Sequence, residues 1–280
     1  MILVAVPLCD PKAYAQTIAL DAIAAQDFNL KEIVLFIDVQ TKDVPGDERT
    51  PWNELLAWTL RAEELFAGVV IDWWWDTRDQ GYGDNDMGKR IRPIALAREK
   101  ARIYAMNRVM WKGYIEAAAP KPGVDGAAWY SPVSETDGRE ITHIWYVDAD
   151  VAPPPHALGR LLALNVPLAS GVFWGRLGNG GRGVPYVFQK YLEGHGYGVH
   201  FLRRTFSGVI EADFVGAGCL LVREDLFQRV SWRHWKVDAD ETFWSEDAYY
   251  CFDAERAGFG KVKVDSGITC KHHDPSGAVT

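Results

Sequence analysis

The feature that most constrains the fold is a repeated alternation of short apolar runs with segments of helical spacing. Residues 1–8 and 32–38 are apolar runs of strand length, and residues 13–25 between them carry apolar side chains at helical spacing. Strands that are apolar on both faces are typical of a parallel sheet covered by helices. The start of the chain therefore predicts a βαβ unit within an α/β fold that has a mainly parallel sheet.

The same alternation continues through the rest of the chain. We expect further strands at residues 69–75, 143–147, 167–174, 214–222 and 261–264, and helices at about 52–66, 93–111, 156–164, 224–230 and 245–258. We expect loops at 76–88, 113–140 and 175–198, which are rich in Gly, Pro or Asp. Residues 178–183 formally match Gly-x-Gly-x-x-Gly, but they lie far from the first βαβ unit, so we interpret them as part of a lid or acceptor loop.

The composition argues against several classes of protein. The chain has 280 residues, of which 48% are hydrophobic, enough to bury a large core. A net charge of -8 argues against nucleic acid as a bulk ligand. No apolar run is long enough for a membrane span, and residues 1–7 lack the basic region of a signal peptide. The four cysteines show no Cys-x-x-Cys spacing, which fits reduced thiols, so we expect a cytoplasmic protein.

An acidic motif, Asp148-Ala149-Asp150, follows the apolar strand at 143–147 and precedes three prolines. Residues i and i+2 of an extended chain point the same way, so both carboxylates can face one site. Carboxylate oxygens suit Mg²⁺ or Mn²⁺, and a metal at the end of a strand can neutralise a diphosphate. The motif thus predicts a nucleotide-sugar or phosphate site, and the alternative is an acidic turn that the prolines terminate.

Two later groups have residue types that suit such a site. Ser245 fits the N-cap of a helix whose first turn contains Glu246 and Asp247, although the helix dipole favours acids there for stability alone. His272 and His273 are adjacent, and one imidazole beside two carboxylates would complete a mixed nitrogen and oxygen metal site.

The order of these signals resembles the metal-dependent glycosyltransferases of the GT-A fold, in particular the family 2-like enzymes, over nearly the whole chain. The matching positions are Val6-Pro7, Asp38, Ala97-Arg98, Asp148-Ala149-Asp150, the segment from Phe214 to Arg223, Glu246-Asp247 and His272. The resemblance implies a single GT-A domain over residues 1–280. Its nucleotide-binding half is expected at about 1–150 and its acceptor and catalytic half at about 151–280.

The resemblance also implies a role for each matching residue. Asp148 and Asp150 would bind a divalent cation, Mn²⁺ or Mg²⁺, together with the ribose and diphosphate of a nucleoside-diphosphate sugar, and His272 would complete the metal shell. The donor site would further include Pro7, Asp38 at the nucleobase and Arg98 on the pyrophosphate side. Asp247 would be the catalytic base, with Glu246 orienting the donor or acceptor.

Parts of the chain depart from the family. The family often has Ala-Arg-Asn where this chain has Ala97-Arg98-Glu99, so the residue after Arg98 departs from the family pattern. Segments 76–92 and 113–140 have no family counterpart and are candidates for acceptor selection. The acceptor, whether a glycan, a small molecule or another hydroxyl-bearing substrate, stays open. Family frequency favours a UDP-sugar over GDP-mannose as donor.

The expected chemistry agrees with these residue types. Sugar transfer needs a Lewis acid for the leaving phosphate and a base for the acceptor hydroxyl, and a base on the opposite face predicts inversion. One alternative is a haloacid-dehalogenase-like phosphatase with Asp148 as nucleophile, although that motif usually lies on the first strand of its fold. Another is a non-catalytic carbohydrate-binding protein with a structural metal.

Overall fold

The computed structural model describes residues 1–9, 15–41, 53–75, 87–106, 139–176, 183–193, 196–201, 206–233, 245–274 and 279–280. Most of the first two expected loops, at 76–86 and 113–138, lies outside the described residues. The same holds for 178–182 of the Gly-x-Gly-x-x-Gly match.

The first half of the chain forms the parallel part of the sheet, as expected. Strand β1 (Ile2–Cys9) pairs in parallel with β2 (Ile33–Thr41) and with β4 (His143–Val147), and β2 pairs in parallel with β3 (Gly68–Trp75). The connections between β1, β2 and β3 contain α1 (Ile18–Ala24), a 3₁₀ turn (Leu30–Glu32) and α2 (Asn53–Leu65). The predicted βαβ unit is therefore confirmed.

The second half adds strands in both directions, so the sheet is mixed rather than mainly parallel. Strand β12 (Cys219–Arg223) runs antiparallel to both β4 and β6 (Leu168–Arg176), while β13 (Val262–His272) runs parallel to β6 and antiparallel to β10 (Val209–Ala212). The order along the sheet is β10-β13-β6-β12-β4-β1-β2-β3. The two halves of the chain thus share one sheet.

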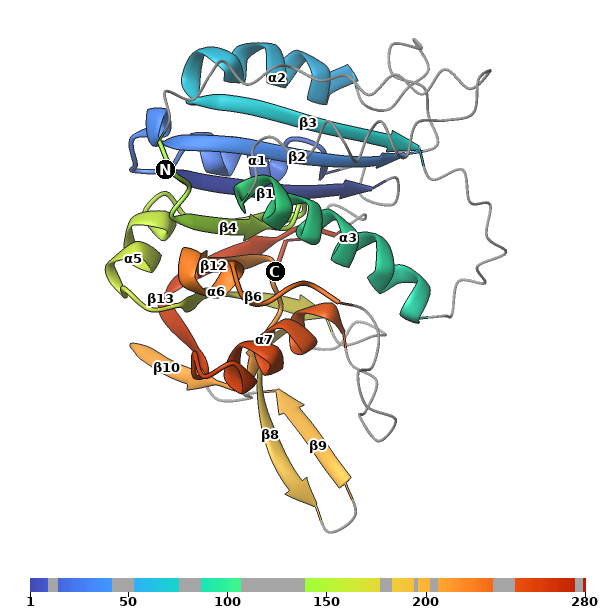
Figure 1. Ribbon diagram of the computed structural model, residues 1–280, viewed down its shortest axis with the longest axis vertical. Helices are drawn as coiled ribbons and strands as arrows, with labels where there is room; N and C mark the ends of the chain where they lie inside the picture. The colour runs from blue at the N-terminus through green and yellow to red at the C-terminus, as the bar shows by residue number, and fades with distance from the viewer. Residues whose placement is uncertain are drawn as a thin grey trace.

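Several segments differ from their expected form. The glycine-rich region from 175 includes β7 (Gly183–Pro185), which pairs with β6, and a hairpin of β8 (Val187–Glu193) and β9 (Gly196–Phe201) that extends away from the main sheet (Figure 1). The expected strand at 214–222 is split into β11 (Phe214–Val215), which pairs with β8, and β12. Strand β13 is far longer than the expected 261–264 and pairs through its end with β5 (Val151–Ala152).

Helices cover both faces of the sheet (Figure 1). Alternate residues of β1 and β2 point to opposite faces, so each strand contributes to both halves of the core. One half includes side chains from α1, α2 and α5 (Ala157–Ala163). The other includes side chains from α3 (Met87–Met106), α6 (Glu224–Phe227) and α7 (Glu246–Arg256).

Helix α3 is the element that positions most of the site. It begins before the expected residue 93, contacts β1, β2, β4 and α7, and carries both Arg98 and Lys100. Its many charged residues make it unlike a membrane segment, and none of the described helices is long and apolar enough to cross a membrane.

Candidate functional site

The predicted site residues lie at the ends of elements that meet around β4. Asp148 follows the last residue of β4, Glu246 and Asp247 begin α7, and His272 ends β13. Arg98 comes from α3, which packs against β4 and α7. Side chains far apart in the sequence are therefore gathered near the carboxyl end of one central strand.

The acidic motif forms a turn rather than a continuation of the strand. The Val151 amide donates to the Asp148 carbonyl at 2.9 Å, and the Asp148 amide donates to the Gly218 carbonyl at 3.2 Å. The turn is also tied to its neighbours, because the His273 amide donates to the Asp150 carbonyl at 2.8 Å. The expectation that Asp148 and Asp150 lie on an extended chain is thus wrong, and the two carboxylates contact different partners.

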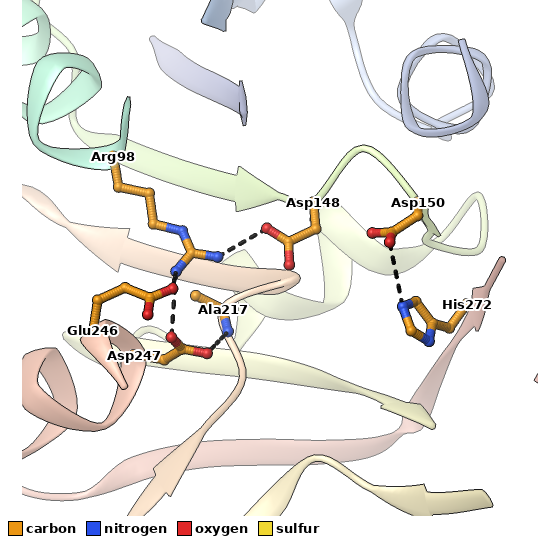
Figure 2. Close-up of polar contacts among 7 residues, drawn as sticks. All are labelled: Arg98, Asp148, Asp150, Ala217, Glu246, Asp247 and His272. Carbon is orange, nitrogen blue, oxygen red and sulfur yellow. Dashed lines mark hydrogen bonds and ion pairs between the residues drawn. The ribbon is translucent and has the colours of Figure 1, made fainter. Parts of the chain in front are cut away.

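Arg98 joins three of the predicted acids (Figure 2). Its Nη2 atom lies 2.8 Å from Asp148 Oδ1, and its Nη1 atom lies 2.8 Å from Glu246 Oε1 and 3.5 Å from Asp247 Oδ1. Only 2% of the Arg98 side chain is exposed. We refer to these four residues as the Arg98 cluster. A side chain this buried would have to leave its partners to reach a pyrophosphate, so the structure favours a positioning role for Arg98.

The Trp232 ring packs against the guanidinium of Arg98, and Tyr146 in turn contacts Trp232. The guanidinium carbon lies 5.0 Å from the centre of the Trp232 ring, and Trp232 Nε1 donates to the Tyr146 hydroxyl at 3.0 Å. The backbone amide of Trp232 donates to Glu99 Oε2 at 2.9 Å. Glu99, which departs from the family pattern, therefore fixes the residue on which Arg98 packs. Neither Glu99 nor Trp232 was predicted from the sequence to have a role in the site.

One cation faces three acids in the Arg98 cluster, so the charges do not balance. Burial works against the charged guanidinium, but the charges of Asp148, Asp247 and Glu246 outweigh it, and the pKa of Arg98 lies above its ordinary value. Burial raises the pKa of Glu246 well above its ordinary value, and the charge of Asp247 adds to this rise while Arg98 opposes it. Glu246 therefore favours its protonated form.

A protonated Glu246 is compatible with both of its contacts. Its carbonyl oxygen can still accept from Arg98, and its hydroxyl can donate to Asp247, with which it forms a side-chain hydrogen bond. The two acids also differ in exposure, since 6% of the Glu246 side chain and 19% of the Asp247 side chain are accessible. Of the two, Asp247 is the one that a substrate can reach.

The protonation of Glu246 leads to a stability prediction. Because its folded pKa lies above the unfolded value, its contribution to stability is present at low pH and is lost as the pH rises through the folded pKa. Gln stays neutral, so Glu246→Gln should gain free energy of unfolding relative to the natural protein as the pH rises from about 5 to about 9. Denaturant unfolding measures this, with Glu64→Gln on the exposed surface of α2 as the control. A relative stability that falls with rising pH would mean that Glu246 is ionised.

Asp247 has a second contact that fixes its carboxylate. Its Oδ2 atom accepts from the Ala217 amide at 3.3 Å, in the turn between β11 and β12. Gly216 and Gly218 flank this alanine, and a Cβ atom on them would lie 2.6 Å and 3.0 Å from ring atoms of Phe173. The Phe173 ring therefore occupies the space next to both glycines.

His272 and Asp150 face one another on the other side of the acidic turn (Figure 2). The His272 Nε2 atom lies 3.5 Å from Asp150 Oδ2, and Nδ1 lies 3.1 Å from the Trp174 carbonyl oxygen. A carbonyl only accepts, so Nδ1 carries a proton. In the neutral ring, the Nε2 lone pair then points at a carboxylate, an arrangement that a cation between them stabilises. His273 contacts the turn through its backbone amide.

The side chains at the acidic turn meet the ligand preferences of a hard divalent cation in part. No group of three or more His, Cys, Asp and Glu side chains among the described residues is assembled closely enough to hold a metal. Asp150 and His272 supply one oxygen and one nitrogen ligand. Asp148 gives only Oδ1 to Arg98 and keeps 20% of its side chain exposed, which leaves Oδ2 for a cation.

Pro7 and Asp38 lie together on the neighbouring strands. They are register partners in β1 and β2, and Asp38 is in turn the register partner of Asp72 in β3. Asp38 is almost fully buried, and its oxygens accept from Gln40 and Lys100. Asp72 and Lys100 were not among the residues predicted from the sequence. The signal was available, because Asp72, like Asp38, interrupts an apolar strand and so requires a buried partner.

Comparisons with known proteins identify the fold. No family model matches the sequence, and no curated protein matches it significantly. Among solved structures, GalNAc-T7 with UDP, GalNAc and Mn²⁺ superposes with a TM-score of 0.52 and 12% identity, over 97% of this chain and 43% of that chain. TarS of S. aureus in complex with UDP-GlcNAc gives 0.48 and 14%, over 96% and 57%, and A197 from STIV gives 0.41 and 12%, over 100% and 92%.

At 12% identity, the similarity to GalNAc-T7 bears on the fold alone, and this chain spans less than half of that protein. The sheet order, the helices on both faces and the superposition agree with the expectation from the sequence: the chain has the GT-A fold of glycosyltransferases.

Proposed function

We propose that the protein is a glycosyltransferase that moves a sugar from a nucleoside-diphosphate sugar to an acceptor hydroxyl. A UDP-sugar is the preferred donor, and GDP-mannose is the alternative. The observation that carries the proposal is the Arg98 cluster, in which Arg98 contacts Asp148 on one side and both Glu246 and Asp247 on the other. Asp148, on the side of the sugar donor, and Asp247, the candidate base, are thereby held in one site on a GT-A fold.

On the donor side, Asp150, His272 and the outer oxygen of Asp148 would hold Mn²⁺ or Mg²⁺. A divalent cation there supplies Lewis-acid stabilisation of the leaving diphosphate. The Trp174 carbonyl fixes the His272 ring with Nε2 toward Asp150. The structure of GalNAc-T7 contains UDP and Mn²⁺, which supports a divalent cation at the donor by analogy.

On the acceptor side, Asp247 would be the base that deprotonates the hydroxyl. The Ala217 amide and Arg98 both donate to its carboxylate, and such bonds keep it oriented. Glu246 is more buried and would orient its neighbour through their hydrogen bond. Attack by a hydroxyl activated on the face opposite the leaving group would invert the anomeric carbon.

The proposal is tested by incubating the purified protein with a panel of nucleotide sugars and Mn²⁺ and measuring released nucleoside diphosphate. We expect release from a UDP-sugar and its loss in EDTA. Release of inorganic phosphate from simple esters would instead indicate a phosphatase. Binding of a glycan without any release would indicate a carbohydrate-binding protein.

Asp150→Ala should abolish the metal-dependent part of nucleotide affinity and leave the fold intact. The turn keeps its backbone bond to His273 in this variant, because that bond uses the Asp150 carbonyl. Titration calorimetry with UDP, in Mn²⁺ and in EDTA, measures the effect, and Asp225→Ala on the exposed surface is the matched control. If the natural protein bound UDP equally well in EDTA, the metal site would be wrong.

A further inference from the structure

Strand β13 changes the face to which its side chains point partway along its length. Val262 and Val264 pack on the side of the sheet that α3, α6 and α7 cover, whereas Ile268 and Cys270 pack on the side of α1, α2 and α5. In an uninterrupted strand these four side chains would share one face, because residues two apart point the same way. An irregularity between the two pairs therefore reverses the strand.

The irregularity is a bulge of β13 against β6. Strand β13 pairs regularly with β6 up to Val264 and again from Thr269 onward. The residues in between, 265–268, lie opposite Gly171 alone, so β13 has three residues in excess of its partner. An odd number of extra residues moves every later side chain of the strand to the opposite face.

The bulge decides whether His272 faces the acidic turn. Beyond the bulge, His272 points to the same side as Cys270, and its Nε2 atom faces Asp150 Oδ2 (Figure 2). Its ring also lies 5.9 Å from the ring of Phe173, which belongs to the same half of the core. In a strand without the bulge, His272 would point to the other face of the sheet, away from Asp150.

Arg160 of α5 holds the bulge through Asp265. Its Nε atom donates to Asp265 Oδ2 at 2.9 Å, and its Nη2 atom donates to Asp265 Oδ1 at 2.9 Å. The Gly267 amide donates to the same Oδ1 atom at 2.8 Å. We refer to these three residues as the Asp265 network. One carboxylate thus ties the backbone of the bulge to the helix that packs beside it.

Gly267 leaves room for this arrangement. A Cβ atom on it would lie 2.5 Å from Arg160 Nη2 and 2.7 Å from Arg160 Cζ. The guanidinium is the far end of a flexible side chain that is 49% exposed, so a larger residue at 267 would push it away from Asp265. His156 adds a contact at the same place, because its Nε2 atom lies 3.1 Å from the Gly267 carbonyl oxygen.

A regular pairing of β13 with β6 would need neither the bulge nor a carboxylate with only 3% of its side chain exposed. Bulges beside functional sites commonly re-aim a side chain. We propose that Arg160, Asp265 and Gly267 are positioning residues that aim His272 at the cation of the donor site. This inference rests on the proposed function, in which His272 is a metal ligand, and adds three residues that act on it through β13.

Arg160→Met removes both bonds to Asp265 and keeps most of the side-chain volume. Titration calorimetry with Mn²⁺ should show an affinity lower by about tenfold or more, in the range typical of residues that orient a metal ligand. Arg160→Lys keeps the charge but not the two-pronged geometry, so it should recover only part of the affinity. Lys263→Met is the matched control, because Lys263 lies on β13 before the bulge and pairs with Glu211.

The His272 ring can also be followed without metal. Its Nδ1 proton faces the Trp174 carbonyl and should give an imidazole N–H signal in ¹⁵N NMR that is missing in His272→Gln. The signal should shift or disappear in Arg160→Met and in Gly267→Ala, which disturbs the network without removing a charge. It should be unchanged in Lys263→Met. A bulge that only stabilised the fold would lower the free energy of unfolding and leave the signal in place.

The outcomes separate this inference from the proposed function, and unfolding curves identify the variants that are folded. If a folded Arg160→Met or Gly267→Ala keeps the natural Mn²⁺ affinity or the natural His272 signal, the positioning role is wrong while the transferase proposal stands. If the natural protein binds no Mn²⁺, both the metal site of the proposed function and this inference are wrong.

Discussion

Asp247→Asn should lose most of the transfer rate while the protein still binds metal and nucleotide. A positioned base typically contributes about 10²–10⁴-fold to rate, and an amide cannot take the proton of the acceptor hydroxyl. The substitution preserves size, and the Asn oxygen can still accept from the Ala217 amide, so the turn next to β12 should stay in place. The loss should therefore appear in kcat, with little change in the affinity for UDP.

The matched control is the neighbouring acid. Glu246→Gln keeps an acceptor for Arg98 and removes a carboxyl group that already favours its protonated form, so it should lose less activity than Asp247→Asn. Both variants are compared under saturating donor with the true acceptor. Near-natural transfer by Asp247→Asn would refute the assignment of the base, and with it the argument for inversion.

The strands of the first half could be predicted closely from the sequence because both of their faces are buried. Strands β1, β2 and β3 begin and end within about three residues of the predicted bounds, since a continuous apolar run leaves little choice of register. Strand direction was predicted less well. Apolar runs look alike in parallel and antiparallel strands, so the antiparallel pairing of β12 with β4 and β6 could not be read from periodicity.

The missed strands have identifiable causes. The glycines between 175 and 198 suggested a loop, yet β7, β8 and β9 lie within or next to that region. At Gly175, a Cβ atom would lie 1.8 Å from the Tyr186 ring, so this glycine makes room for a packed aromatic side chain. The sequence cannot distinguish a glycine needed for close packing from one that breaks a strand.

The site residues were predicted as a set, but their contacts were not. Asp148, Asp247 and Arg98 were each proposed from local motifs, whereas the contact of Arg98 with Asp148 spans 50 residues and its contact with Asp247 spans 149. Local motifs contain no information on such pairings. For this reason, Arg98 was expected at the pyrophosphate, and its burial among three acids came only from the fold.

Arg98→Met should be the most destabilising single substitution in the site. Removing one partner of a buried ion pair typically costs about 3–5 kcal/mol, because the remaining charges stay buried without compensation. In this protein three acids would lose their shared cation, and the Trp232 ring would lose the guanidinium that packs against it. Denaturant unfolding at neutral pH measures the loss. Arg223→Met, which breaks an exposed pair with Asp225, should cost about 1 kcal/mol or less.

A second substitution distinguishes lost charge from lost packing. If Arg98 stabilises the fold by neutralising the acids, then Arg98→Met combined with Glu246→Gln should recover part of the loss, because one buried carboxyl group no longer needs a cation. If the loss came from packing against Trp232 alone, the two substitutions would be additive. A folded Arg98→Met protein with natural stability would show that the three acids do not depend on Arg98, and the Arg98 cluster would then no longer support a link between donor and acceptor sides.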